Sequence, residues 1–189
     1  PLNFEENVKE AKKLLKEAGY ENGEGLPELE LMYNSEGSHK AIMEVIEQNW
    51  KAIGVNVKLT NQEWAVFINT RQNGDYQIAR HGWSADYLDP MTFLDMWVSG
   101  KDEDKNSWGN NDAHFSNSEY DDLIKKAKSE ADSKKRFEYM RKAEEILLEE
   151  TPVIPIYDYT KVYGVQSYVK GFRASTLGSV YFDGAYIEE

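Results

Sequence analysis

The chain has 189 residues, a formal net charge of −12 at pH 7 and no cysteine. This length suits one domain, or one domain with a fragment, but not two full lobes with a cleft between them. The negative charge is spread along the chain and argues against nucleic acid as a partner. The lack of cysteine excludes disulfides and thiolate sites. No run approaches the ~20 apolar residues of a membrane span, and residues 1–4 are no signal peptide, so we expect a cytoplasmic protein or part of an exported precursor.

The first half of the chain alternates helical and strand-like patterns. Asn3 and Glu6 have the spacing of a capping box, and apolar residues then recur at helical spacing until Gly19. The strand-like segments instead alternate apolar and polar residues. Alternating strands and helices are typical of an α/β fold. The expected elements are a helix over 3–18, a strand over 28–33, a helix over 38–53, a strand over 55–60, a helix over about 64–73 and a strand over 77–81.

The second half is richer in helices and ends in a less regular segment. Asp89 can cap a helix whose first residue is Pro90 and which runs to about Trp97. The composition then turns to Gly, Asn, Asp and Ser, which predicts a long loop. The remaining expectations are a loop over 99–117, helices over 118–131 and 133–149 with Asp132 as the second cap, β-like runs over 153–157 and 161–166, and little periodicity over 169–189.

The segment Gly82 to Pro90, GWSADYLDP, is the sharpest candidate site because Trp83 stands three residues before Asp86. It leaves the carboxyl end of an expected strand, where open α/β sheets usually place ligands. A peptide amino terminus is mostly charged at neutral pH. A carboxylate ~4 Å away would attract it by roughly 4 kcal/mol at an effective dielectric of ~20, before desolvation is subtracted. The alternative is that Asp86 caps a turn and Trp83 belongs to the core.

Three further residues are weaker candidates. Trp64 could join Trp83 as a large apolar wall for varied side chains, although Trp64 on a helical face is more often a core residue. Arg80 and His39 could receive a free carboxylate. Their alternatives are a salt-bridge partner for Arg80 and an ordinary first-turn helix residue for His39.

Metal and catalytic motifs are weak or missing. Asp102, Asp104 and Asn106 open like an EF-hand loop, but Ser107 stands where that loop needs glycine and Ala113 where it needs glutamate. We therefore reject calcium binding by this mode. The three histidines lie far apart and lack the spacing of metal ligands. No nucleophile elbow, P-loop or dinucleotide fingerprint is present, so we expect no enzyme, cofactor or metal site.

Seven segments in order carry a family resemblance: EENVKEAKKLLKEAGY, LELMYNSEGSHK, GVNVKLTNQEW, ARHGWSADYLDPMTFL, FSNSEYDDLIKKAK, KRFEYMRKAEEILLEETPVIPIYDY and YVKGF. Together they resemble the last third of the oligopeptide-binding proteins of ABC importers, in family 5 of the extracellular solute-binding proteins. The resemblance implies an α/β lobe of the periplasmic-binding-protein-like type II fold, with a mixed sheet flanked by helices. Residues 1–160 would form the C-terminal ligand-binding lobe, and 161–189 a tail that returns to the first lobe.

The same resemblance implies roles for individual residues. Asp86 corresponds to the aspartate that pairs with the amino terminus of a peptide. Trp64 and Trp83 correspond to the walls of side-chain pockets. Main-chain groups around Gly82 and Ser84 would pair with the peptide as an added strand.

The remaining implications concern the far end of the ligand and the setting of the protein. Arg80 and His39 would meet carboxylates of peptides of different length, and Tyr159 would face the cleft near the hinge. The resemblance implies an extracytoplasmic, non-enzymatic protein, a lipoprotein in some members, that delivers short peptides to permease subunits and meets the membrane only through them or a lipid anchor. The alternatives are a lobe of the same fold for an oligosaccharide, metal chelate or haem, and a cytoplasmic acidic enzyme.

Overall fold

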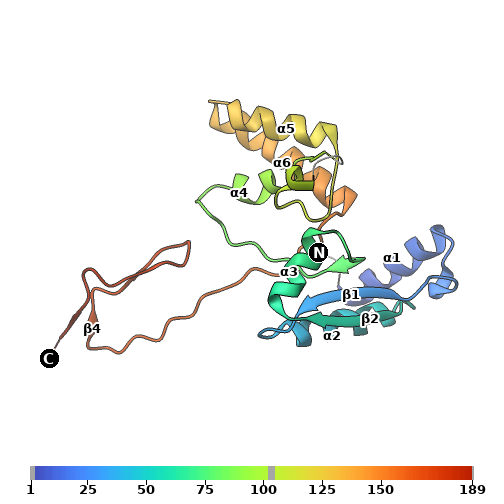
Figure 1. Ribbon diagram of the computed structural model, residues 1–189, viewed down its shortest axis with the longest axis horizontal. Helices are drawn as coiled ribbons and strands as arrows, with labels where there is room; N and C mark the ends of the chain where they lie inside the picture. Colours follow the sequence, from blue (N-terminus) through green and yellow to red (C-terminus); the bar gives the residue numbers. More distant parts are fainter. Residues whose placement is uncertain (1–2, 102–104, 189) are drawn as a thin grey trace. The chain divides into compact units, whose positions relative to one another are not determined.

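The computed structural model describes residues 3–101 and 105–188 of the chain. Helices and strands combine into an α/β structure, as expected, which divides into two compact units, Pro1–Gly82 and Trp83–Glu189 (Figure 1). The predicted boundary near residue 160 lies inside the second unit and stays a prediction. Within the described ranges, none of the helices has the length and apolar character needed to span a bilayer.

A three-stranded sheet forms the middle of the first unit. Its strand order is β2-β1-β3, and both pairings are parallel. The three strands described for this sheet therefore all run in the same direction. The reason is that a helix follows β1 and β2, and such crossovers return the chain in the same direction. The elements are α1 (Phe4–Glu17), η1 (Glu21–Gly23), β1 (Leu29–Asn34), α2 (His39–Lys51), β2 (Val57–Gln62), α3 (Trp64–Gln72) and β3 (Ile78–Ala79).

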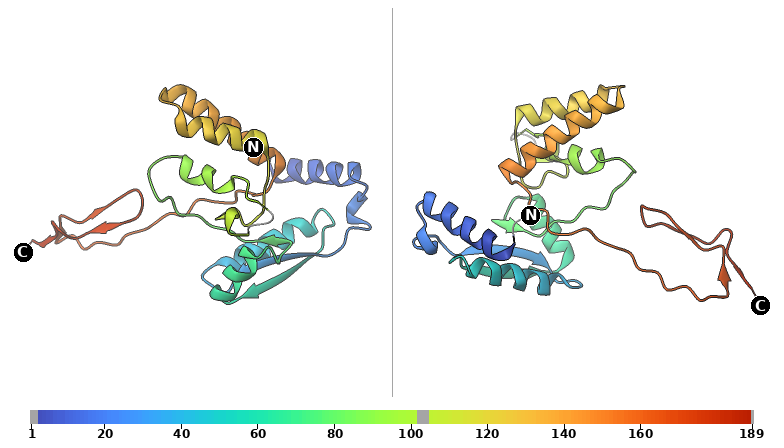
Figure 2. Two further views of the ribbon diagram at one scale, coloured as in Figure 1. Left: turned by 45° about the horizontal axis from the view of Figure 1, so that its top comes forward. Right: turned by 180° about the vertical axis from the view of Figure 1, so that it is seen from behind.

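Helices α1 and α2 cover one face of this sheet (Figure 2). Leu31 and Tyr33 alternate along β1, so both point to that face, and each is 4% exposed. They pack with Met43 of α2 in one apolar cluster. The expected capping box is confirmed, because the Asn3 side chain accepts from the Glu6 amide at 2.9 Å and the Glu6 carboxylate accepts in return. Local caps and the apolar alternation thus position the sheet.

The second unit is built on a helical hairpin. Tyr120 and Ile124 of α5 are fully buried in a cluster that also contains Met91 and Leu94. The expected helix over 90–97 begins one residue later than predicted and tightens into a 3-10 turn after its first four residues. Asp132 caps the second hairpin helix, as expected. The elements are α4 (Met91–Leu94), η2 (Asp95–Trp97), η3 (Lys105–Trp108), α5 (Ser118–Ser129) and α6 (Ser133–Glu150).

The C-terminal segment differs from its prediction. The expected β-like runs over 153–157 and 161–166 contain no strand, although their residues favour one. Strand formation needs a pairing partner as well as suitable side chains, and neither run has one within the described residues. Short antiparallel pairs occur instead where little periodicity was expected, joining β4 (Val169–Lys170) to β7 (Tyr186–Ile187) and β5 (Arg173–Ala174) to β6 (Val180–Tyr181).

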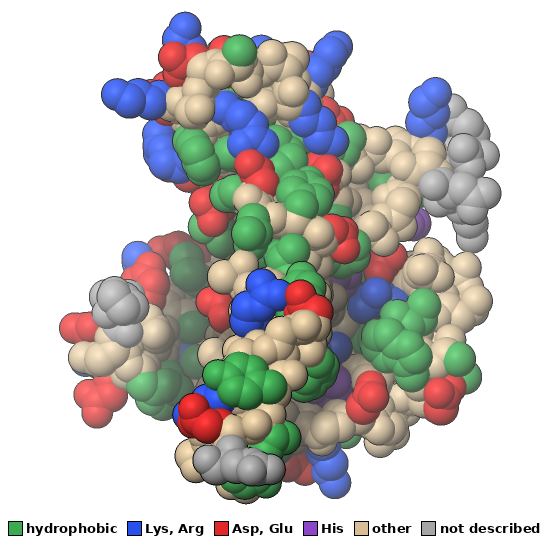
Figure 3. All heavy atoms as spheres, turned by 90° about the vertical axis from the view of Figure 1, so that its left-hand side faces the viewer, with side chains coloured by type: hydrophobic (Ala, Val, Ile, Leu, Met, Phe, Trp, Pro, Cys, Tyr) green, Lys and Arg blue, Asp and Glu red, His purple; other side chains and the backbone are tan. Residues whose placement is uncertain are grey.

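Charge is unevenly distributed over this unit. Lysine and arginine side chains gather at the turn between α5 and α6, at the top of Figure 3, although the chain as a whole carries −12. Lys125, Lys126, Lys134 and Lys135 are all exposed there. The excess of acidic residues is therefore carried by other parts of the chain.

Candidate functional site

The carboxyl ends of the three parallel strands lie at one edge of the first unit. β1 ends at Asn34 and is followed closely by His39, the first residue of α2. Trp64 begins α3 two residues after the end of β2, and Arg80 directly follows β3. The parallel topology therefore gathers the predicted residues His39, Trp64 and Arg80 at the edge where open α/β sheets place ligands.

Arg80 is held at this edge by a buried asparagine. Its Nη1 donates to Oδ1 of Asn34 at 3.4 Å, and Asn34, which is 0% exposed, donates to the Glu36 carboxylate at 3.1 Å. The His39 amide donates to the Glu36 carbonyl at 3.3 Å. A Cβ on Gly82 would lie 3.0 Å from Nη2 of Arg80, so the guanidinium packs closely against that backbone. Asn34 was missed from the sequence because its role depends on the neighbouring strand.

Trp64 lies on the surface of the first unit. It is 48% exposed and stacks on the buried Phe67 ring, with 6.1 Å between ring centroids. The core interpretation of Trp64 is therefore wrong, because a core indole would be covered. About half of the indole is available to a ligand, while Phe67 anchors its other side.

His81 lies between Arg80 and Gly82 and is neutral at pH 7. Burial lowers its pKa to about 4, with the positive charges of Arg71 and Arg80 adding to the effect. Sequence reasoning considered this histidine only as a metal ligand. The structure shows in addition that this imidazole ring stays uncharged beside two guanidinium groups.

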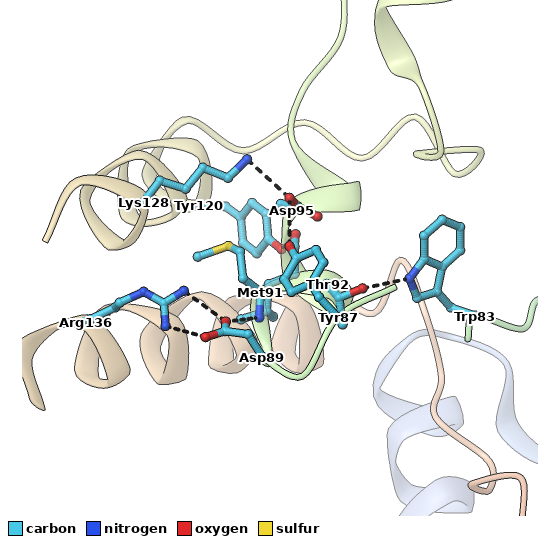
Figure 4. A network of polar contacts seen from close by, with 10 residues as sticks. Trp83, Tyr87, Asp89, Met91, Thr92, Asp95, Tyr120, Lys128 and Arg136 are labelled. Carbon is cyan, nitrogen blue, oxygen red and sulfur yellow. Dashed lines mark hydrogen bonds and ion pairs between the residues drawn. The ribbon is translucent and has the colours of Figure 1, made fainter. Parts of the chain in front are cut away.

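The hydroxyl group of Thr92 accepts hydrogen bonds from two predicted residues of the GWSADYLDP loop, and Figure 4 shows its contact with Trp83. Trp83 Nε1 donates to Oγ1 of Thr92 at 3.4 Å, and the Asp86 amide donates to the same atom at 3.1 Å. Thr92 is 2% exposed, whereas Asp86 and Ser84 are exposed. Among the described residues, none makes a hydrogen bond or ion pair with the Asp86 carboxylate, so that group is available to an incoming cation.

Asp89 ties the loop to the helical hairpin. Its carboxylate accepts from the Met91 amide at 2.9 Å and from both terminal nitrogens of Arg136 at 2.7 and 2.9 Å. The hydrogen bond from Arg136 lowers the pKa of Asp89, and the Met91 amide lowers it further. Bidentate pairs of this kind fix orientation as well as proximity. The predicted capping role of Asp89 is thus present, although the helix starts at Met91.

A second ion pair lies on the other side of α4. Lys128 Nζ is 3.3 Å from the Asp95 carboxylate, which also accepts a long 3.5 Å hydrogen bond from the Tyr87 hydroxyl. Burial raises the pKa of Tyr87, and the charges of Asp95 and Asp89 raise it further. The short helix is therefore fixed to the hairpin at both ends.

A pocket of about 370 Å³ opens beside this network. Trp83, Asp86 and Thr92 line it, together with Asp95 and Trp108. A volume of this order accommodates a small ligand or part of a larger one. A pocket lined by indoles and carboxylates suits a cationic group that carries apolar substituents.

The other predicted residues are more scattered. Tyr159 is 61% exposed and packs edge to face on Tyr157, with 4.9 Å between ring centroids. Asp102 and Asp104, considered for calcium, lie outside the described residues. Across residues 3–101 and 105–188 no three His, Asp or Glu side chains gather as metal ligands.

Thr92 and Arg136, like Asn34, were not identified from the sequence. A threonine inside the otherwise apolar turn Met91 to Leu94 was a weak signal for a buried hydroxyl with a specific partner. Arg136 gave no local signal, since it lies 47 residues from Asp89.

The chain matches the family model described as bacterial extracellular solute-binding proteins, family 5 middle, over residues 1–105. It is 40% identical to the oligopeptide-binding protein OppA of Bacillus subtilis, covering 98% of this chain and 34% of that protein. The periplasmic oligopeptide-binding protein OppA of Salmonella typhimurium is 37% identical, covering 94% of this chain and 32% of its own. The chain therefore spans about a third of the length of these curated relatives.

Solved structures agree with these relatives. The murein tripeptide-binding protein MppA of Escherichia coli aligns with a TM-score of 0.80 at 34% identity, over 98% of this chain and 35% of that one. Haemophilus influenzae OppA in complex with the peptide RPPGFSPFR aligns with a TM-score of 0.77 at 35% identity, over 97% of this chain and 35% of the other.

Proposed function

Because the chain belongs to the bacterial extracellular solute-binding proteins of family 5, we propose that it is the C-terminal ligand-binding lobe of a peptide-binding protein. The longer protein captures short peptides outside the cytoplasm and delivers them to the permease subunits of an ABC importer. Residues 1–160 form the lobe in this proposal, and residues 161–189 return to the first lobe. The related proteins named for oligopeptide binding support this substrate class.

The exposed Asp86 carboxylate carries the proposal. The loop also contains Asp89, but that carboxylate is bound by Arg136, whereas the Asp86 carboxylate shares its pocket with the indole of Trp83. A carboxylate with no hydrogen-bond or ion-pair partner among the described residues is suited to the α-amino group of a peptide. The indole excludes water from one side and adds cation–π attraction of about 1 kcal/mol.

The rest of the peptide would be recognised with little regard to its sequence. Main-chain groups around Gly82 and Ser84 pair with the peptide backbone as an added strand, because every peptide offers the same donors and acceptors. Trp64 provides an apolar wall, and Arg80 and His39 receive the terminal carboxylate. Tyr159 contacts the ligand near the hinge. Binding and release are the whole activity in this proposal, with no catalytic step.

The test compares peptides with free and N-acetylated amino termini. In the full-length protein that carries this chain, Asp86→Asn should weaken binding of free peptides by about 2 to 5 kcal/mol, the cost of cutting one member of a desolvated charge pair. Acetylated peptides should lose much less. Asp122→Asn, an exposed aspartate on α5, is the matched control and should leave both affinities unchanged.

Calorimetry of the two peptide sets separates the possible outcomes. Equal losses for free and acetylated peptides on Asp86→Asn would make this residue structural and remove the amino-terminus assignment. An oligosaccharide ligand would stack on Trp64 and Trp83 without needing an ionised Asp86. Saturable binding of a sugar that survives Asp86→Asn would therefore favour that alternative.

A further inference from the structure

Thr92 occupies an unusual place in the loop network. Its hydroxyl oxygen is buried and accepts two hydrogen bonds, one from the Trp83 indole and one from the Asp86 backbone. A hydroxyl oxygen has two acceptor sites, so these two donors use both. A threonine in a helix more often donates back to a carbonyl one turn earlier. Here the oxygen instead joins two upstream groups that the sequence alone marks as ligand-binding candidates.

The loop between these groups has no regular structure of its own. Residues 80–85 form neither helix nor strand, so no backbone ladder sets the distance between the indole and the Asp86 carboxylate. The shared oxygen of Thr92 supplies this missing restraint, because the Trp83 indole N–H and the backbone amide of Asp86, the residue that carries the carboxylate, both lie within hydrogen-bonding distance of that one atom. Fixing a binding surface before the ligand arrives reduces the conformational entropy lost on binding.

Thr92 is itself held in place by contacts outside the loop. The Met91 amide, one residue earlier, donates to the Asp89 carboxylate. The same carboxylate accepts hydrogen bonds from both terminal nitrogens of Arg136. The Thr92 amide donates to the Asp89 carbonyl at 3.2 Å. A chain of polar contacts therefore runs from α6 through Asp89 and Thr92 to the pocket (Figure 4).

We propose that Thr92 is a positioning residue that sets the Trp83 indole and the Asp86 carboxylate at the spacing required to bind the amino terminus of a peptide. This inference rests on the proposed function. In this role Thr92 does not bind the ligand itself. It acts by holding the two residues that do. Arg136 supports it from α6 by fixing the start of α4.

Two substitutions separate the hydroxyl from the bulk of the side chain. Thr92→Val keeps the shape and removes the oxygen, while Thr92→Ser keeps the oxygen and removes a methyl group. In the full-length protein, Thr92→Val should weaken binding of free-amino peptides about tenfold, the effect of losing one or two neutral hydrogen bonds. N-acetylated peptides should change by less than about threefold, and Thr92→Ser should restore the wild-type preference.

A second measurement reads the geometry without any ligand. In the NMR spectrum of the full-length protein, Trp83→Phe identifies the indole N–H signal of Trp83 as the one that disappears. In Thr92→Val this signal and the Asp86 amide signal should both shift and exchange faster with solvent. In Thr92→Ser both should stay near their wild-type positions.

The outcomes are distinct. If Thr92→Val binds free peptides like the wild type, or loses free and acetylated peptides equally, or if Thr92→Ser fails to restore the preference, the positioning role is overturned. Unchanged indole and amide signals in Thr92→Val would overturn it as well. Failure of the proposed function looks different, because Asp86→Asn would then leave the preference for free amino termini intact.

Discussion

Two segments of the chain have little regular structure but are held very differently. The GWSADYLDP loop is fastened by a buried threonine, and its Asp89–Arg136 ion pair has side chains only 27% and 24% exposed. The segment 161–189 has a comparable pair, Arg173–Asp183, whose side chains are 63% and 69% exposed. Its apolar side chains are also open, with Val162 92% exposed.

The difference shows what fixes irregular backbone. Short polar contacts have a larger effect where water and salt do not compete for the same groups. The loop has such contacts at Thr92 and at the Asp89–Arg136 pair, whereas the C-terminal segment has mainly exposed ones. We therefore expect the loop to be rigid on its own, while the exposed apolar residues of 161–189 need another surface, such as the first lobe of the proposed two-lobed protein.

The largest expected difference between the two segments is the loss of stability when a buried or an exposed isoleucine is truncated. Ile124 is 1% exposed beneath α4, and Ile187 is 64% exposed in the C-terminal segment. Ile124→Ala should lower the free energy of unfolding by about 2 to 5 kcal/mol, because it leaves a cavity in a packed cluster. Ile187→Ala should change it by less than about 0.5 kcal/mol. Urea denaturation measures both, and similar losses would show that the two segments are equally well packed.

A smaller effect concerns pH at the entrance to the loop. The pKa of His81 is lowered to about 4, while an unfolded histidine titrates near its usual pKa of 6.5. Between these values the unfolded chain binds the proton and the folded chain does not, so stability is full above pH 6.5 and falls as the pH drops toward 4. The loss should reach at most about 3 kcal/mol. His81→Gln should not show this loss. If the free energy of unfolding changed with pH in the same way for both proteins, the burial of this ring would be contradicted.

Local signals made much of the first unit predictable from sequence. The Asn3 and Glu6 cap and the alternation around Leu31 depend on neighbours a few residues away, and both were found. The strand pairs near the C terminus were missed because pairing depends on a distant segment. The parallel arrangement of β1, β2 and β3 follows from the helical crossovers between them.

The candidate site divides in the same way. Asp86 and Trp83 could be proposed from the sequence because a tryptophan, a carboxylate and a loop signal stand together there. Thr92 and Arg136 were missed, since their importance comes from atoms that meet only after folding. Sequence therefore indicated the groups that would face a ligand and not the groups that hold them.

Shielding from solvent should make one of two similar aspartate–arginine ion pairs stronger than the other. Asp89–Arg136 and Asp183–Arg173 are both aspartate–arginine pairs with two short contacts, at 2.7 and 2.9 Å and at 2.8 Å for each contact. A double-mutant cycle with Asp→Asn and Arg→Gln should give a coupling energy of about 1 to 3 kcal/mol for the first pair. The exposed second pair should give about 0.2 to 1 kcal/mol.

Salt sharpens this contrast, because raising ionic strength screens exposed pairs more than shielded ones. In 1 M sodium chloride the coupling between Asp183 and Arg173 should fall to near zero, while most of the coupling between Asp89 and Arg136 should persist. Equal coupling energies, or equal salt dependence, would mean that the loop and the C-terminal segment are held by interactions of the same strength. The fixed geometry around the Asp86 carboxylate would then need another cause.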